Sequence, residues 1–276
     1  MRIALYQTQT GPDPGTNGRD LVRAIAEAAK GGAVMLFTPE MSGLLDRDRE
    51  RAARHLRDEA SDTVLATVRA AAAENGIWVH LGSLALAQEN DDGRLVNRGF
   101  LIDDRGDIRA RYDKIHLFDV DLPTGESWRE SVAYASGTRG VAVETPLGLM
   151  GLSICYDLRF PDLYRALSNA GATILSIPAA FTVPTGEAHW HVLLRARAIE
   201  AGVFVVAAAQ TGRHEDGRET YGHSLVVDPW GKVLLDMGTE PGLGFADIDT
   251  AEVDTVRERL PAIRHRRPID PPDIVR

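Results

Sequence analysis

The single cysteine of the sequence, Cys155, stands where a reactive thiol would be presented to a ligand. It follows an apolar run at residues 149–154, typical of a buried strand, and precedes a helix that begins at Pro161. The carboxyl end of such a strand faces the crevice where α/β proteins bind ligands, and the backbone N–H of Tyr156 would point toward an oxyanion formed there. Taken alone, Cys155 also fits a buried structural cysteine, because cysteine packs as a small apolar residue.

Two charged residues, Glu40 and Lys114, occupy equivalent positions. Glu40 comes just after the apolar run 33–37, and Lys114 follows the predicted strand 108–112. A carboxylate there can act as a general base that takes a thiol proton and later activates water, whereas an ammonium group can stabilise an oxyanion. Each of them alone also fits an ordinary surface charge. Three such groups, each just beyond a strand, predict one nucleophilic site.

Short apolar runs that alternate with helical periods indicate the elements that position these groups. We expect strands at residues 3–7, 33–37, 77–81, 95–102, 108–112, 149–154, 172–177, 203–209, 224–227 and 233–235, and helices at 19–30, 62–74, from Pro161 and at 187–201. The polar stretch 117–139 is long for a connection in a compact domain. No linker or repeat interrupts the alternation, which predicts one α/β domain of sheets covered by helices.

Composition narrows the class of protein. The 276 residues are 44% hydrophobic and 26% charged, as in a globular protein, and the formal net charge of −9 disfavours nucleic acid as the main partner. No apolar run approaches the length of a membrane span, and the first residues lack the apolar core of a secretory signal. One cysteine cannot form an internal disulfide. We therefore expect a cytoplasmic protein that neither spans a membrane nor binds nucleic acid.

Three segments resemble the signatures of the nitrilase superfamily of carbon–nitrogen hydrolases. They read Thr-Pro-Glu at 38–40, Tyr-Asp-Lys-Ile-His-Leu-Phe-Asp at 112–119 and Ser-Ile-Cys-Tyr-Asp-Leu-Arg-Phe-Pro at 153–161. Further stretches, among them Ala-His-Trp at 188–190 and Val-Asp-Pro-Trp-Gly at 227–231, are similar to the branch that contains deaminated-glutathione amidase and ω-amidase. The order Glu, Lys, Cys matches the superfamily, and the resemblance covers nearly the whole chain.

The resemblance implies an architecture and further site residues. It implies a four-layer α-β-β-α sandwich (α/β, α+β-like) over residues 1–276, with a C-terminal tail from about 262, assembled as a homodimer or higher homo-oligomer. It also implies a second active-site glutamate between Lys114 and Cys155. Glu130 is preferred because Glu-Ser at 130–131 falls where related amidases carry this pair, and Glu126 is the alternative.

These residues lead to a mechanistic hypothesis. Glu40 takes the proton of Cys155, the thiolate attacks an amide carbonyl, and Lys114 and the N–H of Tyr156 hold the oxyanion. Ammonia leaves, and water activated by Glu40 releases the acid from the thioester. No metal or organic cofactor is required.

The pocket residues are expected to follow two of the strands. Phe181 and Thr182 would line the pocket at a strand end. Arg159 would face either a substrate carboxylate or a neighbouring acid, and a structural ion pair is the favoured interpretation.

For substrate, the resemblance implies a small-molecule amide, with deaminated glutathione first and α-ketoglutaramate or a related ω-amide second. An N-carbamoyl amino acid also stays open. Nitriles are disfavoured, because the nitrile-cleaving branch has Trp-Glu where this chain has Tyr156-Asp157. A binding protein that only keeps the fold is the non-enzymatic alternative, against which the three intact polar residues count.

The histidines do not have the spacing of a known metal motif. His189 and His191, or His214 and His223, lack both a cysteine pair and the H-E-x-x-H pattern, so a structural or substrate-shaping role is favoured. A Cys-His catalytic pair is an alternative that explains less of the chain.

Overall fold

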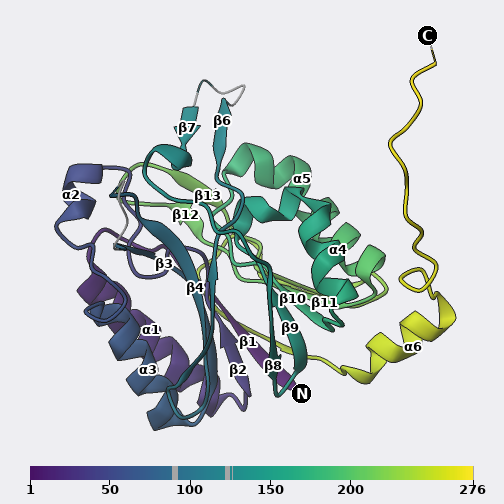
Figure 1. Ribbon diagram of the computed structural model, residues 1–276. Helices are drawn as coiled ribbons and strands as arrows, with labels where there is room; N and C mark the ends of the chain where they lie inside the picture. The colour runs from purple at the N-terminus through teal and green to yellow at the C-terminus, as the bar shows by residue number, and fades with distance from the viewer. Residues whose placement is uncertain (89–92, 122–124, 126, 276) are drawn as a thin grey trace.

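Two six-stranded sheets pack face to face between layers of helices in the computed structural model (Figure 1), which describes residues 1–88, 93–121, 125 and 127–275. The first sheet has, in spatial order, β16 (Gly242–Asp247), β1 (Arg2–Gln7), β2 (Met35–Phe37), β3 (Trp78–Leu86), β4 (Val96–Ile102) and β5 (Ile108–Asp113). The second has β15 (Val233–Asp236), β14 (Leu225–Val227), β11 (Phe204–Ala207), β10 (Ile174–Ser176), β9 (Gly148–Leu152) and β8 (Val141–Thr145). This is the predicted four-layer α-β-β-α sandwich.

Each sheet has a parallel centre and antiparallel edges. In the first, β1, β2 and β3 are parallel; in the second, β9, β10 and β11 are parallel. Helices α1 (Pro14–Lys30) and α3 (Thr63–Asn75) cover the outer face of the first sheet, and α4 (Pro161–Asn169) and α5 (Val183–Ala201) cover that of the second (Figure 1). In such sheets, ligands bind at the carboxyl ends of the parallel strands.

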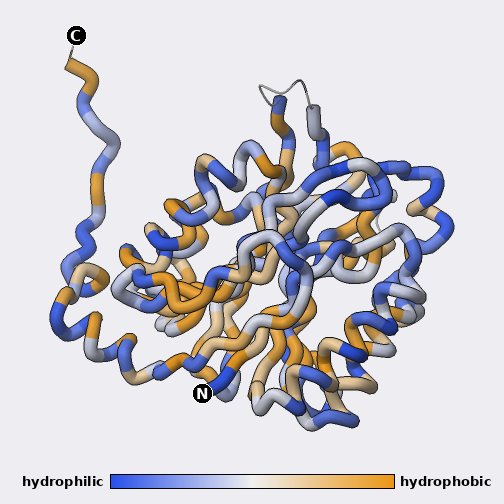
Figure 2. Tube along the Cα trace, turned by 180° about the vertical axis from the view of Figure 1, so that it is seen from behind, coloured by the Kyte–Doolittle hydropathy of each residue, from blue (hydrophilic) through white to orange (hydrophobic). Residues whose placement is uncertain are grey.

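The alternation of side chains along the strands explains why both sheet faces are apolar. In β1, Ile3 and Leu5 pack between the sheets, whereas Ala4 packs against the helices. In β2, Phe37 packs between the sheets and Leu36 packs against the helices. Strands covered on both faces read as continuous apolar runs, and Figure 2 shows apolar residues gathered along them.

Most predicted elements are confirmed, but two helices begin earlier than expected. Helix α1 begins at Pro14 and not at residue 19, because the carboxylate of Asp13 accepts the N–H groups of Gly15 and Thr16 and caps the helix. Helix α5 begins at Val183 and not at 187, with a proline in its first turn. The helical period alone did not reveal these polar first turns.

Several short or half-exposed elements were not predicted. They are α2 (Arg49–Ala53), β6 (Asp119–Asp121), β7 (Ser127–Arg129), the edge strand β8, β12 (Thr211–Arg213), β13 (Glu219–Tyr221), β16 and α6 (Ala251–Arg259). The polar stretch 117–139 thus contains the β6–β7 ribbon and a 3-10 turn at Glu130–Val132. Beyond α6 the chain extends away from the sandwich (Figure 1).

Among the helices of the described residues, none combines the length and apolar character needed to cross a membrane.

Candidate active site

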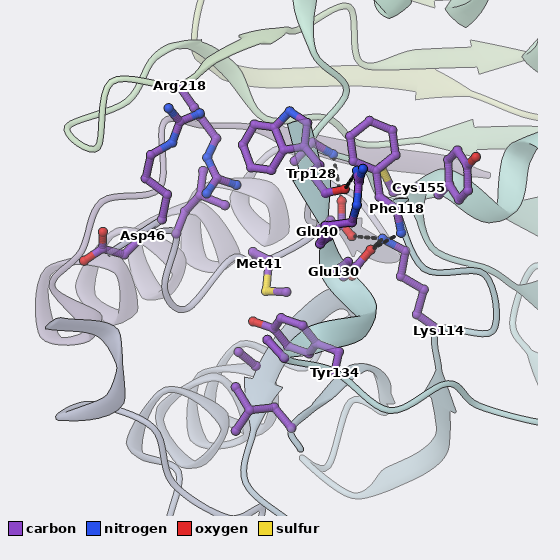
Figure 3. Close-up of a pocket in the computed structure, with 18 of the residues that line it drawn as sticks. Glu40, Met41, Asp46, Lys114, Phe118, Trp128, Glu130, Tyr134, Cys155 and Arg218 are labelled. Carbon is purple, nitrogen blue, oxygen red and sulfur yellow. Dashed lines mark hydrogen bonds and ion pairs between the residues drawn. The ribbon is translucent and has the colours of Figure 1, made fainter. Parts of the chain in front are cut away.

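Four polar residues predicted from distant segments line one cavity of about 590 Å³ (Figure 3). Glu40 follows β2, Lys114 follows β5, Glu130 begins the 3-10 turn after β7, and Cys155 follows β9. Glu40, Lys114 and Cys155 are 4%, 2% and 7% exposed. The fold therefore brings these residues together at one end of the sandwich. Glu126, the alternative second glutamate, lies outside the described residues.

Lys114 lies between the two glutamates. Its Nζ is 2.8 Å from Oε1 of Glu40 and 2.9 Å from Oε2 of Glu130. Asn97, the second residue of β4, donates from Nδ2 to Oε1 of Glu40 at 2.9 Å and to Oε1 of Glu130 at 3.3 Å. Because Lys114 and Asn97 both donate to each carboxylate and the ammonium has two acceptors, this buried charge cluster is paired and held in one geometry.

Backbone contacts fix the carboxylate of Glu40. The N–H of Ala180, from the loop after β10, donates to Oε2 at 3.0 Å. The Glu40 loop also approaches β3 closely at Gly82, where a Cβ would lie 2.2 Å from the carbonyl oxygen of Thr38 and 2.4 Å from that of Pro39. Only glycine permits this approach.

The backbone at Cys155 adopts a left-handed conformation, with φ of 49°, at the turn from β9 into the 3-10 helix Cys155–Arg159. Its N–H donates to the carbonyl of Pro178 at 2.8 Å. A non-glycine residue in this region is strained, and such strain is found at sites that present a side chain. The surrounding hydrogen bonds must hold the turn in place.

The buried carboxylate of Asp157 supplies most of that support. It accepts the N–H of Ile154 at 2.9 Å, the hydroxyl of Tyr112 at 2.7 Å and the N–H of His116 at 3.0 Å, and Nδ1 of His116 lies 2.7 Å away. Sequence reasoning had given this residue no role beyond its place in the signature. Its partners come from both sheets, so it ties the cysteine turn to the segment that carries Lys114.

Replacing Asp157 with alanine is expected to lower the free energy of unfolding by about 3 kcal/mol, because several buried donors lose their acceptor. Urea denaturation followed by circular dichroism measures this. Asp162→Ala is the matched control, since the Asp162 side chain is 89% exposed, and it should change stability by less than about 0.5 kcal/mol. Equal stability of the two variants would show that Asp157 does not support the turn.

Electrostatics keep the thiol protonated at rest. Burial and the charge of Glu40 raise the pKa of Cys155 well above its ordinary value, and Lys114 opposes them only in part. Burial alone would lower the pKa of Lys114, but the carboxylates of Glu130 and Glu40 outweigh it and raise that pKa. A neutral thiol beside a carboxylate and a fixed ammonium group needs a base, and Glu40 is the carboxylate within reach.

The remaining predicted pocket residues, Tyr156, Arg159, Phe181 and Thr182, also line the cavity. The guanidinium of Arg159 lies 5.4 Å above the ring of Phe181 and 5.8 Å from that of Tyr156, with Nη1 3.3 Å from Nδ1 of His189. The structural ion pair favoured from the sequence was wrong: no carboxylate in the described part of the chain pairs with Arg159. Aromatic rings support this cation instead.

Asn97 is a further residue of the site that sequence reasoning missed. The polar amide of Asn97 inside the predicted strand 95–102 was the available signal, because a polar group that is buried in a strand needs partners. Its Oδ1 has no hydrogen-bond partner among the described residues, so the amide is held by its donations to the two glutamates.

The four histidines weighed from the sequence have partners other than Cys155, which for His189 is Arg159. His214 is buried and hydrogen-bonded to Thr220, and His191 and His223 share the carboxylate of Asp236. None of the four, His189 included, lines the cavity.

Comparisons with known proteins agree with this geometry. The family model for carbon-nitrogen hydrolases matches residues 2–258. The deaminated glutathione amidase of Bos taurus is 42% identical over 269 residues, which are 96% of this chain and 82% of that protein.

Two solved structures share the fold. Nit3 of Saccharomyces cerevisiae, a member of branch 10 of the nitrilase superfamily, superposes with a TM-score of 0.85 at 26% identity, covering 95% of this chain and 94% of that one. A glutamate-to-glutamine mutant of the amidase from Nesterenkonia sp. AN1, with the acetamide moiety of fluoroacetamide added covalently at its active-site cysteine, superposes with a TM-score of 0.79 at 27% identity, covering 96% and 95%. By sequence and by fold, this chain belongs to the carbon–nitrogen hydrolase family.

Proposed function

We propose that this carbon–nitrogen hydrolase is a thiol amidase in which Cys155 forms a thioester with the acyl part of a small amide. The main support for the proposal is that the neutral thiol of Cys155, the carboxylate of Glu40 and the ammonium group of Lys114 line the same cavity in fixed positions.

In the first half of the reaction, Glu40 takes the proton of Cys155 as the sulfur attacks the carbonyl carbon. Lys114 and the N–H of Tyr156 stabilise the negative charge that develops on the carbonyl oxygen. The C–N bond then breaks, the nitrogen takes the proton from Glu40, and a thioester on Cys155 remains.

In the second half, water replaces the departed nitrogen group. Glu40 takes a proton from this water, the hydroxide attacks the thioester, and the acid leaves as the thiol is restored. One glutamate serves both halves because each consumes and returns one proton.

In this proposal, Glu130 and Asn97 hold the side chains of Lys114 and Glu40 in position. Glu130 neutralises the ammonium group together with Glu40, and it accepts the N–H of Phe118 at 2.6 Å. With both carboxylates held, Lys114 keeps one position as charge moves between thiol and oxyanion. Such preorganisation is a large part of catalysis.

The proposed substrate is deaminated glutathione, the compound named in the 42% identical relative. This compound lacks the amino group of glutathione and keeps two carboxylates. The cavity suits an anionic molecule, because the basic residues in its lining outnumber the acids Glu40, Asp46, Glu130 and Glu219; besides Lys114 they are Arg47, Arg49, Arg94, Arg129, Arg159 and Arg218. Arg159 is the one nearest in sequence to Cys155, and it lies on two aromatic rings without a carboxylate partner among the described residues.

Both amide bonds of deaminated glutathione are secondary, so its hydrolysis releases an amine and not the ammonia expected from the sequence, whereas α-ketoglutaramate would release ammonia. The test therefore measures both products, by mass spectrometry and by an ammonia assay, for deaminated glutathione, α-ketoglutaramate, an N-carbamoyl amino acid and a simple nitrile. We expect the highest kcat/KM with deaminated glutathione. Fastest turnover of another compound would keep the thiol mechanism and reject this substrate, and no turnover of any would favour a binding protein.

We also propose that the chain self-associates and works in the cytoplasm. Exposed apolar side chains lie on α5, just after α6 and between β14 and β15: Val192, Ile199, Leu260 and Trp230. A catalytic thiol that must stay reduced suits a reducing compartment.

A further inference from the structure

Outside the catalytic cavity, His191, His223 and Asp236 converge from three separate segments. His191 lies on α5, His223 lies between β13 and β14, and Asp236 ends β15. One carboxylate oxygen of Asp236 is 2.9 Å from Nε2 of His191, and the other is 2.9 Å from Nδ1 of His223. We propose that these three side chains form a binding site for a divalent transition-metal ion of the Zn²⁺ type.

The geometry is close to that of a bound ion. Donor atoms that share one Zn²⁺ at about 2.0–2.2 Å lie about 3.0–3.5 Å from one another. Two of the three pairs of side chains are already at 2.9 Å, and all three donor atoms lie within 4.8 Å of one another. A small movement of the imidazoles, with Nε2 of His191 and Nδ1 of His223 as the unprotonated ring nitrogens, would complete the site.

Hydrogen bonds to and from the backbone hold two of the proposed ligands, His223 and Asp236, in place. His223 has a left-handed conformation, with φ of 54°. Its N–H donates to the carbonyl of Gly238 at 2.7 Å, and its carbonyl accepts the indole N–H of Trp190 at 2.8 Å. The N–H of Gly238 donates to Asp236 at 2.9 Å. His223 and Asp236 are thereby fixed on the same turn.

An ion can reach the site from solvent. The side chains of His191, His223 and Asp236 are 32%, 22% and 35% exposed. The ring of Tyr221 stacks on His223 with 4.4 Å between centroids and closes one side. Two imidazoles and one carboxylate suit Zn²⁺, Co²⁺ or Ni²⁺ and not the all-oxygen preference of Mg²⁺ or Ca²⁺.

A bound metal ion would connect α5 to the edge of the second sheet without taking part in amide hydrolysis. None of the three ligands lines the catalytic cavity. The site therefore predicts a structural ion that raises the thermal stability of the folded chain, because a ligand that binds only the native state stabilises it.

The test titrates Zn²⁺ into the full chain by calorimetry, in a Cys155→Ala background so that the thiol cannot bind the ion. We expect one Zn²⁺ per chain and a rise in Tm with added Zn²⁺. His191→Ala and Asp236→Asn should each weaken binding at least about 10-fold and abolish the rise in Tm. His189→Ala is the matched control on the same helix and should bind Zn²⁺ as the parent does.

Two results would overturn the proposal: no saturable Zn²⁺ binding by the parent, or binding that survives both substitutions. His191→Ala removes a partly exposed side chain, so the test stands even where Asp236→Asn fails to fold. Co²⁺ in place of Zn²⁺ adds visible d–d absorption bands that report the coordination geometry of the bound ion.

Discussion

Replacing Cys155 with serine is expected to lower kcat/KM by at least about 10⁴-fold, while the protein stays folded. A hydroxyl is far less acidic than a thiol, so the carboxylate of Glu40 can no longer generate the nucleophile. The side chain is nearly isosteric, and its surroundings remain paired through Asp157. The measurement is steady-state kinetics with the best substrate of the panel.

Ser153→Ala is the matched control for this substitution. Ser153 lies two residues before the nucleophile, is buried and donates to the carbonyl of Ser176 at 2.9 Å. Its loss should affect stability more than kcat. Activity of the Cys155→Ser variant within tenfold of the wild type would exclude nucleophilic catalysis by Cys155.

Replacing Glu40 with glutamine is expected to lower kcat by about 10³-fold and to lower the pKa of the Cys155 thiol at the same time. In the wild type, burial and the negative charge of Glu40 both raise that pKa, and Lys114 lowers it. Without the negative charge of Glu40, only burial raises the pKa of the thiol, and Lys114 still lowers it. The thiolate should then form at lower pH than in the wild type, even though turnover is lost.

The ultraviolet absorbance of the thiolate as a function of pH measures this shift, because the sequence contains a single cysteine. The Cys155→Ser variant supplies the baseline. Glu144→Gln, on the edge strand β8, should change neither kcat nor the thiol pKa. An unchanged kcat in Glu40→Gln would remove the general base from the mechanism, and a raised thiol pKa would contradict the electrostatic account of the site.

The sequence was sufficient to locate Glu40, Lys114 and Cys155, because each follows a predicted strand and those strands end on one side of the sandwich. Their catalytic roles stay predictions until the substitutions are made. The architecture was also predictable, since apolar runs covered on both faces alternate with amphipathic helices. That residues 1–276 form one domain with a tail from about 262 stays a prediction as well.

Contacts between distant segments could not be predicted in this way. Asn97 reaches both glutamates only because of the register of β4 beside β3 and β5. Arg159 has aromatic rings where an acid was expected, and that depends on side-chain packing after the cysteine turn. The His191–Asp236 contact likewise joins a helix to an edge strand, a pairing that no local pattern encodes.

The most direct test of the mechanism is to trap the thioester. Wild-type protein is mixed with deaminated glutathione, quenched in acid during turnover, digested and examined by mass spectrometry. We expect the peptide that contains Cys155 to carry the acyl part of the substrate, and Cys155→Ser to show neither this adduct nor product. Rapid product formation with an unmodified Cys155 peptide at every quench time, together with full activity of the serine variant, would contradict the proposed mechanism.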